Sequence, residues 1–237
     1  MEMQRYSKVL GKNPREMVML KGFPCKWGRC SFCDYIEDNS NCENDIIKFN
    51  KVVLSNITGE LEVLDVINSG SIFELPKETL KDIKNIVIEK NIKKLFVECH
   101  WLYKDRLDEI RNYFNIPIIF RCGIESFDND FRMKVLNKGA GFKSYEEVNK
   151  CFDSICLLVG IKGQTKEMIK NDISILENHF KYGCVNVYVE NTTQVKRDDK
   201  LVEWFIKEYS YLEKNKNIEV LINNTDLGVG SEIDDQK

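Results

Sequence analysis

Short apolar runs alternate with amphipathic stretches along most of the chain. Six of the runs are rich in β-branched and aromatic residues, which favours strands. They predict strands at residues 16–22, 61–70, 93–99, 116–124, 154–160 and 185–191. A further run at residues 218–223 predicts one additional strand.

The stretches between these runs carry a helical period. Residues 44–57 predict a helix, and residues 76–90 predict another, with Pro76 where a helix begins. The apolar face of that second helix consists of Leu80, Ile83 and Val87. A third helix has the clearest apolar stripe, formed by Ile169, Ile173, Leu176 and Phe180.

Alternating strands and helices favour parallel pairing, because each helix returns the chain to begin the next strand in the same direction. The sequence therefore predicts an α/β fold, and a partial (β/α)6 TIM-like barrel is preferred over a doubly wound open sheet. No linker rich in Pro, Gly or Ser interrupts the pattern, so residues 1–237 are expected to form a single domain. The acidic segment at residues 228–237 is expected to be a solvated tail.

Composition and charge narrow the possible partners. The 237 residues are 43% hydrophobic and 31% charged, which suits a globular domain with a substantial core. A net charge of -3, from 35 basic and 38 acidic residues, provides no field that would attract nucleic acid. Because no apolar stretch approaches the length of a membrane span, we expect a cytoplasmic protein with a small-molecule ligand and no membrane partner.

The chain has nine cysteines, an odd number whose scatter does not resemble a disulfide framework. Four of them stand in or beside apolar stretches and are expected to be buried: Cys122, Cys151, Cys156 and Cys184. Cys25, Cys30 and Cys33 differ, because they share one short polar loop with four and then two residues between them.

Three kinds of site could use this cysteine trio. A structural zinc site normally needs four ligands, and the possible additions are Cys42, His100 and His179. The "CSFC" pair could form a redox dithiol. Three thiolates with one open position suit an iron–sulfur cluster that binds a ligand at its fourth iron.

The loop "CKWGRCSFC" resembles the cluster loop of the radical S-adenosylmethionine (SAM) superfamily, although the usual spacing there is three and two residues. The first spacer is thus one residue longer than usual, and the loop must fit this residue without displacing a thiolate. Other motifs resemble the superfamily in the same order: "NSGSIFE" at residues 68–74, "RCGIES" at 121–126 with "NKG" at 137–139, and "LLVGIKGQTKE" at 157–167. Together these matches cover roughly residues 16 to 190.

The resemblance implies that Cys25, Cys30 and Cys33 hold a 4Fe-4S cluster whose fourth iron binds the methionine part of SAM. It also implies an external electron donor such as flavodoxin or ferredoxin. Phe32 would pack beside the adenine, and the Tyr35 backbone would meet the adenine edge. The remaining implied cofactor contacts are Ser69, Gly70, Ser71, Arg121, Glu125, Ser126, Val159 and Gly160.

Polar residues at strand ends indicate the substrate class. Carboxylates there suit a small cationic molecule. The brevity of the chain and its cysteine spacing resemble the small queuine lyases of this superfamily, which cleave the C–N bond of queuine and release 7-aminomethyl-7-deazaguanine. On this resemblance Glu98 and Glu190 are candidate catalytic residues that orient the ammonium, and the candidate substrate contacts are His100, Asn191 and Asn223.

Two alternatives remain at this level: a radical SAM enzyme for another small molecule, and a zinc-binding interaction module. Arg132 and Lys138 stand in a predicted helix, where a solvated face is the simplest interpretation.

Overall fold

The computed structural model describes residues 4–223, which form two compact units. Within that range the first unit comprises residues 4–28 and 35–120, and the second comprises residues 29–34 and 121–223. The cysteine loop is therefore divided, with Cys25 in the first unit and Cys30 and Cys33 in the second. The single domain remains a prediction, and the expected tail at residues 228–237 lies outside the described residues.

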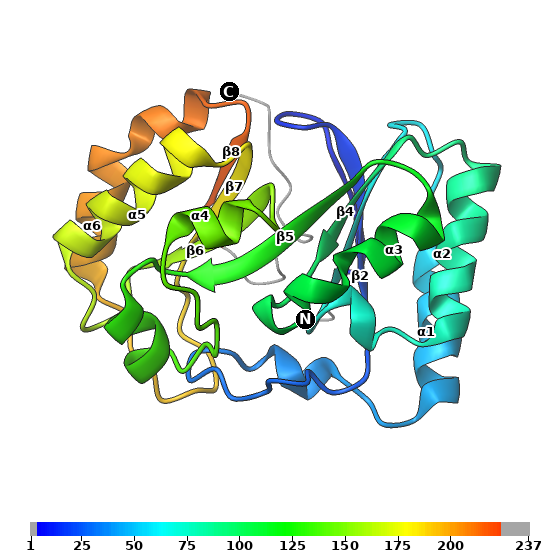
Figure 1. Ribbon diagram of the computed structural model, residues 1–237, viewed down its shortest axis with the longest axis horizontal. Coiled ribbons are helices and arrows are strands. Elements are labelled where there is room, and N and C mark those ends of the chain that lie inside the picture. Colours follow the sequence, from blue (N-terminus) through cyan, green and yellow to red (C-terminus); the bar gives the residue numbers. More distant parts are fainter. Residues whose placement is uncertain (1–3, 224–237) are drawn as a thin grey trace. The chain divides into compact units, whose positions relative to one another are not determined.

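The strands of the first unit confirm three of the predicted strands. Strand β2 (Arg15–Leu20) is parallel to β3 (Val63–Asn68), which is parallel to β4 (Lys94–Glu98) (Figure 1). A short strand, β1 (Tyr6–Val9), pairs antiparallel with β2 and was not predicted. Its sequence "YSKV" buries only Val9 fully, so it lacks the apolar run that identifies the other strands.

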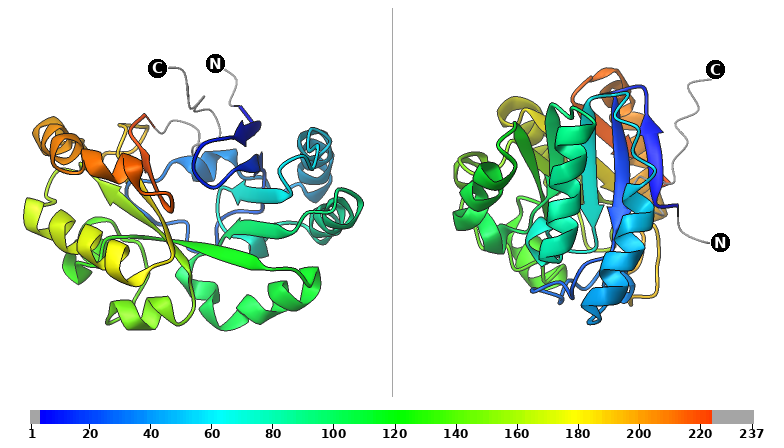
Figure 2. Two further views of the ribbon diagram at one scale, coloured as in Figure 1. Left: turned by 90° about the horizontal axis from the view of Figure 1, so that it is seen from above. Right: turned by 90° about the vertical axis from the view of Figure 1, so that its right-hand side faces the viewer.

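The helices of the first unit are α1 (Glu43–Leu54), α2 (Lys77–Glu89) and α3 (Leu107–Phe114). Helices α1 and α2 lie side by side (Figures 1 and 2). Pro76 precedes α2 as predicted, and Ile83 and Val87 are buried while Leu80 is half-buried. Three short 3-10 helices lie between the strands and helices of this unit: η1 (Tyr35–Asp38), η2 (Ile72–Glu74) and η3 (Trp101–Arg106).

Strand β5 (Ile118–Glu125) begins in the first unit and ends in the second. It is parallel to β6 (Ser154–Val159), and β6 is parallel to β7 (Tyr182–Val187). Strand β8 (Ile218–Leu221) pairs parallel with β7 and confirms the additional strand. Strand β7 starts three residues before its predicted beginning, because Tyr182 and Gly183 already pair with β6, and the chain leaves the sheet after Val187.

The second unit holds α4 (Tyr145–Asn149), α5 (Lys166–His179) and α6 (Asp199–Glu208), together with the π-helix η4 (Phe131–Val135) and the 3-10 helix η5 (Ser210–Lys214). Three residues of the predicted stripe, Ile169, Ile173 and Leu176, are buried, whereas Phe180 is half-buried and follows the last residue of α5. Leu176 packs over Gly183 of β7, where any side chain would overlap it.

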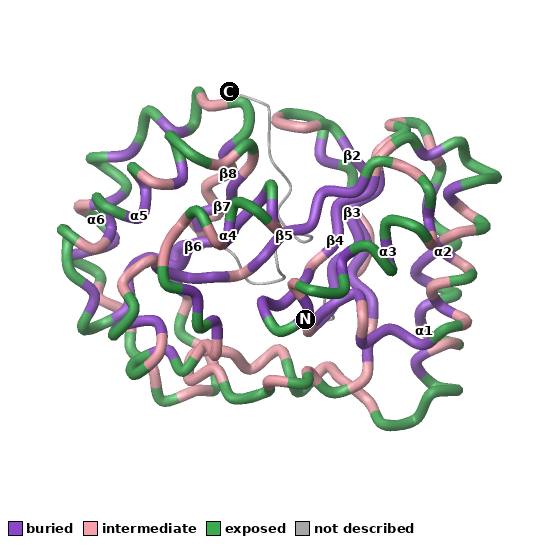
Figure 3. Tube along the Cα trace, in the orientation of Figure 1, coloured by how far each residue is buried: buried purple, intermediate pink, exposed green. Residues whose placement is uncertain are grey.

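The strand order follows the chain from β1 to β8. A doubly wound sheet would reverse its order at a switch point, so that alternative is wrong. The fold is α/β with the strand order of a partial (β/α) barrel, and most residues of its strands are buried (Figure 3). None of the helices in residues 4–223 combines the length and the apolar character needed to cross a bilayer.

Candidate active site

The nine cysteines, all within the described residues, form no disulfide. Cys122, Cys156 and Cys184 are buried as predicted, whereas Cys151 is half-buried. The trio Cys25, Cys30 and Cys33 is partly exposed. Within residues 4–223 no group of three His, Cys, Asp or Glu is placed to hold a single metal ion. A multi-iron cluster does not require its thiolates to converge on one ion.

Gly28 lies in the spacer of four residues between Cys25 and Cys30. Its φ of +56° is in the left-handed region. A Cβ there would lie 3.0 Å from the Cys25 carbonyl oxygen and 3.1 Å from Cδ1 of Ile36. Glycine adopts this conformation without the steric cost of a Cβ, so Gly28 lets the longer spacer turn within the loop.

We expect Gly28→Ala to reduce the amount of iron bound per chain. The Cβ adds about 1–2 kcal/mol of left-handed strain and presses on the Cys25 carbonyl. Iron analysis and visible absorbance after anaerobic reconstitution measure the effect. The matched control is Gly141→Ala, because a Cβ at Gly141 meets nothing within 4 Å. Equal iron binding by both variants would contradict this role for Gly28.

Glu74 links the cysteine loop to the turn after β3. One carboxylate oxygen accepts hydrogen bonds from the Lys26 backbone N–H (2.7 Å) and from the Tyr103 hydroxyl (3.0 Å). The other oxygen accepts from the Ser71 backbone N–H (2.7 Å). Burial raises the pKa of Glu74 even though these donors favour the carboxylate. The sequence motif contained Glu74, but no residue pattern indicated that it bonds to the cysteine loop.

Ser69, Gly70 and Ser71 form the turn that follows β3. A Cβ at Gly70 would overlap Oε2 of Glu74, so the glycine leaves room for that carboxylate. The Ser69 carbonyl accepts a hydrogen bond from the Asn39 side chain (3.1 Å). The side-chain oxygens of Asn39 and Asn68 are buried beside this turn and accept no hydrogen bond. A ligand with N–H donors would satisfy them.

Glu98 is the last residue of β4, and His100 lies two residues after it. Glu98 is partly exposed, and His100 is buried. Nδ1 of His100 accepts a hydrogen bond from the Leu102 N–H (3.1 Å), and its ring stacks on Trp27 of the cysteine loop at 6.3 Å between centroids. The His100 ring therefore supports this loop. The catalytic role of Glu98 and the substrate role of His100 remain predictions.

Tyr35 and Phe32 flank the last cysteine and belong to different units. Tyr35 packs against the apolar cluster of the first unit formed by Val9, Met17, Met19 and Ile67. Phe32 packs against the cluster of the second unit formed by Phe131, Leu136, Leu158, Ile161 and Tyr188. Their contacts with adenine remain predictions.

The segment from Arg29 to Ser31 is fixed to the end of the π-helix. The Arg29 carbonyl accepts from the Asn137 side chain (2.8 Å). The Ser31 N–H and hydroxyl donate to the carbonyls of Leu136 (3.0 Å) and Val135 (2.7 Å). Cys30 therefore stands between two residues whose backbones are both bonded to residues 135–137.

Glu125 and Lys138 form an ion pair of 2.7 Å with side chains only 7% and 12% exposed. A Cβ at Gly123 would press on both charged groups, so this glycine makes room for the pair. Burial disfavours the ammonium, but Glu125 and Cys30 outweigh it and raise the pKa of Lys138. The predicted solvated position of Lys138 is wrong, because the loop after the π-helix returns this side chain to Glu125.

Arg132 is also buried, at 1% exposure, so its predicted solvated position is wrong. Its guanidinium donates to the carbonyls of Ala140 (2.8 Å) and Ser126 (2.8 Å) and lies 3.6 Å from the centroid of the Phe142 ring. Arg132 therefore holds the end of β5 together with the loop after the π-helix.

Asp172 of α5 fixes Ser126 from the other side. It accepts hydrogen bonds from the Ser126 hydroxyl (2.7 Å) and the Phe127 N–H (2.8 Å). Its burial raises its pKa to about 7. The sequence analysis missed it, although an acidic residue three positions after Ile169 lies on the apolar face of that helix. The cofactor contact of Ser126 remains a prediction.

We expect Asp172→Asn to change how stability depends on pH. The folded-state pKa of Asp172 is raised above 3.8, so this side chain is neutral in the folded and unfolded states at low pH. The wild-type protein therefore loses stability as the pH rises towards 7. Relative to the neutral variant, the wild-type free energy of unfolding should fall by up to roughly 4 kcal/mol between pH 4 and pH 8. Urea unfolding across this range measures it, and parallel curves for the two proteins would contradict it.

Three further predicted cofactor residues lie within strands or directly after them: Arg121, Val159 and Gly160. Arg121 of β5 and Val159 of β6 are buried. Gly160 has a φ of +91°, and a Cβ there would overlap Val202 of α6. Its N–H donates to the Gln164 side chain (3.0 Å) and its carbonyl accepts from Asp198 (2.8 Å). Asn223, the predicted substrate contact, is exposed after β8.

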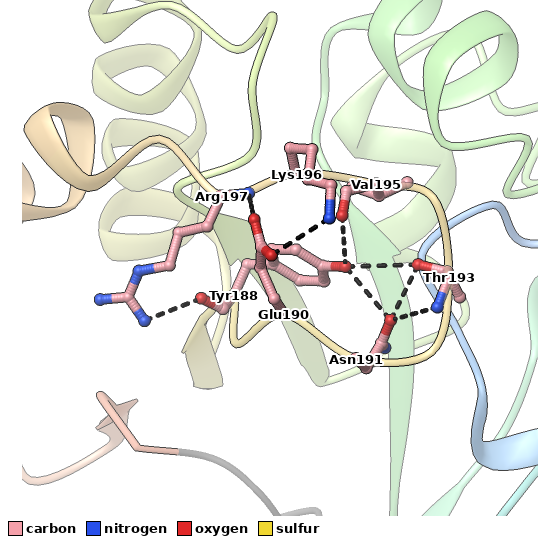
Figure 4. A network of polar contacts seen from close by, with 7 residues as sticks. All are labelled: Tyr188, Glu190, Asn191, Thr193, Val195, Lys196 and Arg197. Carbon is pink, nitrogen blue, oxygen red and sulfur yellow. Dashed lines mark hydrogen bonds and ion pairs between the residues drawn. The ribbon is translucent and has the colours of Figure 1, made fainter.

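Glu190 and Asn191 stand in the loop after β7, and Figure 4 shows the polar network of that loop. Glu190 is exposed and pairs with Lys196 (3.2 Å) and the Arg197 N–H (3.0 Å). Asn191 donates to the Phe32 carbonyl (2.8 Å) and to Asp34 (3.1 Å) in the cysteine loop. Their catalytic and substrate roles remain predictions.

No protein-family model matches the chain. The chain is 50% identical to queuine lyase from Clostridium spiroforme, solved with SAM and queuine bound, over 97% of this chain and 100% of that one, with a TM-score of 0.94. It is 25% identical to an uncharacterized protein of Methanocaldococcus jannaschii, over 94% of this chain and 70% of that protein. Methylornithine synthase shares the fold, with 15% identity and a TM-score of 0.53, over 93% of this chain and 77% of that one.

The strand order and the three-cysteine loop are those of a radical SAM enzyme, which decides against the zinc-binding interaction module. Within that class, the chain belongs to the queuine lyase family.

Proposed function

We propose that this chain is a radical SAM lyase that cleaves the C–N bond of queuine and releases 7-aminomethyl-7-deazaguanine. One observation carries the proposal: 50% identity and a TM-score of 0.94 over essentially the whole of both chains to an enzyme that binds SAM and queuine. The match covers 97% of this chain, so it includes the loops as well as the core.

The residues present fit a 4Fe-4S cluster and SAM. Cys25, Cys30 and Cys33 are outside disulfides and partly exposed, and three soft thiolates leave a fourth iron open. The buried acceptor oxygens of Asn39 and Asn68 suit the ammonium of the methionine part of SAM. Bound together, the cluster and SAM supply a 5'-deoxyadenosyl radical that abstracts a hydrogen atom from the substrate.

The chain's own side chains would orient queuine and manage its proton. The amine of queuine is cationic, so a carboxylate would hold it and receive or return a proton as the C–N bond breaks. Glu98 suits this role better than Glu190, because Glu98 is partly buried where β4 ends, whereas Glu190 is exposed in the loop after β7. The cytoplasmic location and an external electron donor such as flavodoxin or ferredoxin form part of the same proposal.

Anaerobic incubation of the reconstituted protein with SAM, dithionite and queuine, followed by mass spectrometry, tests the function. We expect 5'-deoxyadenosine together with 7-aminomethyl-7-deazaguanine, each dependent on queuine. Untouched queuine with 5'-deoxyadenosine at its background rate would retain the radical SAM class and discard this substrate. Glu98→Gln should lower turnover while cluster content and SAM binding stay unchanged.

A further inference from the structure

The loop after β7 holds the two neighbours of Cys33. The Asn191 amide donates to the Phe32 carbonyl (2.8 Å) and to Oδ1 of Asp34 (3.1 Å). The N–H and hydroxyl of Thr192 donate to Oδ2 of Asp34 (3.1 and 3.2 Å). We name Asp34, Asn191 and Thr192 the Cys33 clamp. All three residues belong to the second unit, as do Phe32 and Cys33.

The orientation of the Asn191 amide is determined by its other contacts. Its carbonyl oxygen accepts from the Thr193 N–H (3.0 Å), the Thr193 hydroxyl (2.8 Å) and the Tyr188 hydroxyl (3.3 Å) (Figure 4). Tyr188 is buried in the apolar cluster that also receives Phe32. A flipped amide would place its N–H groups against these donors, so its NH2 group faces Phe32 and Asp34.

The clamp also reaches Cys30. The Cys33 N–H donates to the Cys30 carbonyl (3.3 Å), so the two cysteines share one turn. The Phe32 carbonyl and the Asp34 side chain are thus held on the two sides of Cys33, which restrains this turn. The direction in which the Cys33 thiolate points then depends on the clamp.

We propose that Asn191 is a positioning residue for the iron–sulfur cluster, acting through Phe32 and Asp34 on the Cys33 thiolate. The inference rests on the proposed function and assigns Asn191 a role other than substrate contact. Residues that orient metal ligands tune both metal retention and the electronic properties of the site. The loop after β7 thereby controls how firmly the cluster is held.

Asn191→Asp isolates this role. The aspartate keeps an acceptor oxygen for Thr193 and Tyr188 but replaces the amide donor with an oxygen that repels the Phe32 carbonyl and Asp34. We expect a chelator to remove iron about tenfold faster than from the wild type, with an altered EPR spectrum of the reduced cluster. The double variant Asp34→Asn with Asn191→Asp restores one amide–carboxylate bond and should recover part of the retention.

Lys196→Gln is the matched control, since Lys196 lies in the same loop and pairs with Glu190. Should Asn191→Asp fail to fold, Thr192→Val removes the hydroxyl contact with Asp34, retains the backbone N–H contact, and should shift both readouts less, in the same direction. The inference would be overturned if Asn191→Asp had the EPR spectrum of the wild type and lost iron at the wild-type rate, whether or not its KM for queuine were raised. A wild-type protein that binds no cluster would instead overturn the proposed function, and the inference with it.

Discussion

Cys30→Ala should purify without the brown iron–sulfur absorbance and bind little iron after anaerobic reconstitution. Three protein thiolates are proposed to hold the cluster, and no other side chain of this loop offers an equivalent soft ligand. Cys25→Ala and Cys33→Ala should behave alike, because each removes one of the same three thiolates. SAM-dependent chemistry should be abolished in all three variants.

Cys42→Ala provides the control. Cys42 is exposed at the start of α1, and its side chain makes no capping hydrogen bond, so its removal should leave stability and iron content unchanged. Iron and sulfide analysis with visible absorbance decides between the residues. A full cluster in Cys30→Ala, or its loss in Cys42→Ala, would refute the assigned ligand set.

Lys138→Met should destabilise the protein by about 3–5 kcal/mol, because it leaves the buried Glu125 carboxylate without its cationic partner. The double variant Lys138→Met with Glu125→Met removes both charges and should recover most of that loss. The midpoint of urea unfolding, measured anaerobically by circular dichroism, reports both effects.

Lys134→Met is the matched control for this ion pair. Lys134 pairs with Asp130 at 2.8 Å in the same segment, but the two side chains are 72% and 71% exposed. Exposed pairs of this kind contribute about 0.3–0.5 kcal/mol, so the midpoint should scarcely move. Similar losses of stability in Lys134→Met and Lys138→Met would show that burial of the Glu125–Lys138 pair does not increase its contribution to stability.

Periodicity was sufficient for most of the fold. The strands of the parallel series and helices α1, α2 and α5 stand where apolar alternation predicted them, because each buries a face whose spacing is visible in the chain. Strand β1 lacked that signal, since pairing with β2 stabilises it rather than an apolar face of its own. The end of β7 was misplaced because Tyr188 and Val189 continue the apolar run after the strand has ended.

The site was less accessible to sequence reasoning. Motifs located the cysteine loop and the strand ends, but they could not show which polar groups bond to one another. Lys138 and Arg132 read as solvated because a basic residue in a helical pattern usually is, and only the folded chain brings Glu125 and the Ser126 carbonyl to them. Asn191 reads as a strand-end ligand until its partners, 159 and 157 residues earlier in the chain, are known.

These sequence separations affect the order of events during synthesis. Cys30 and Cys33 leave the ribosome early, but the residues that fix their loop, from Val135 to Thr192, are translated more than 100 residues later. At about 5–20 residues per second, Asn191 follows Phe32 by roughly 8–30 seconds. The contacts that hold the loop around Cys30 and Cys33 can therefore form only after this interval, once the second unit has been translated.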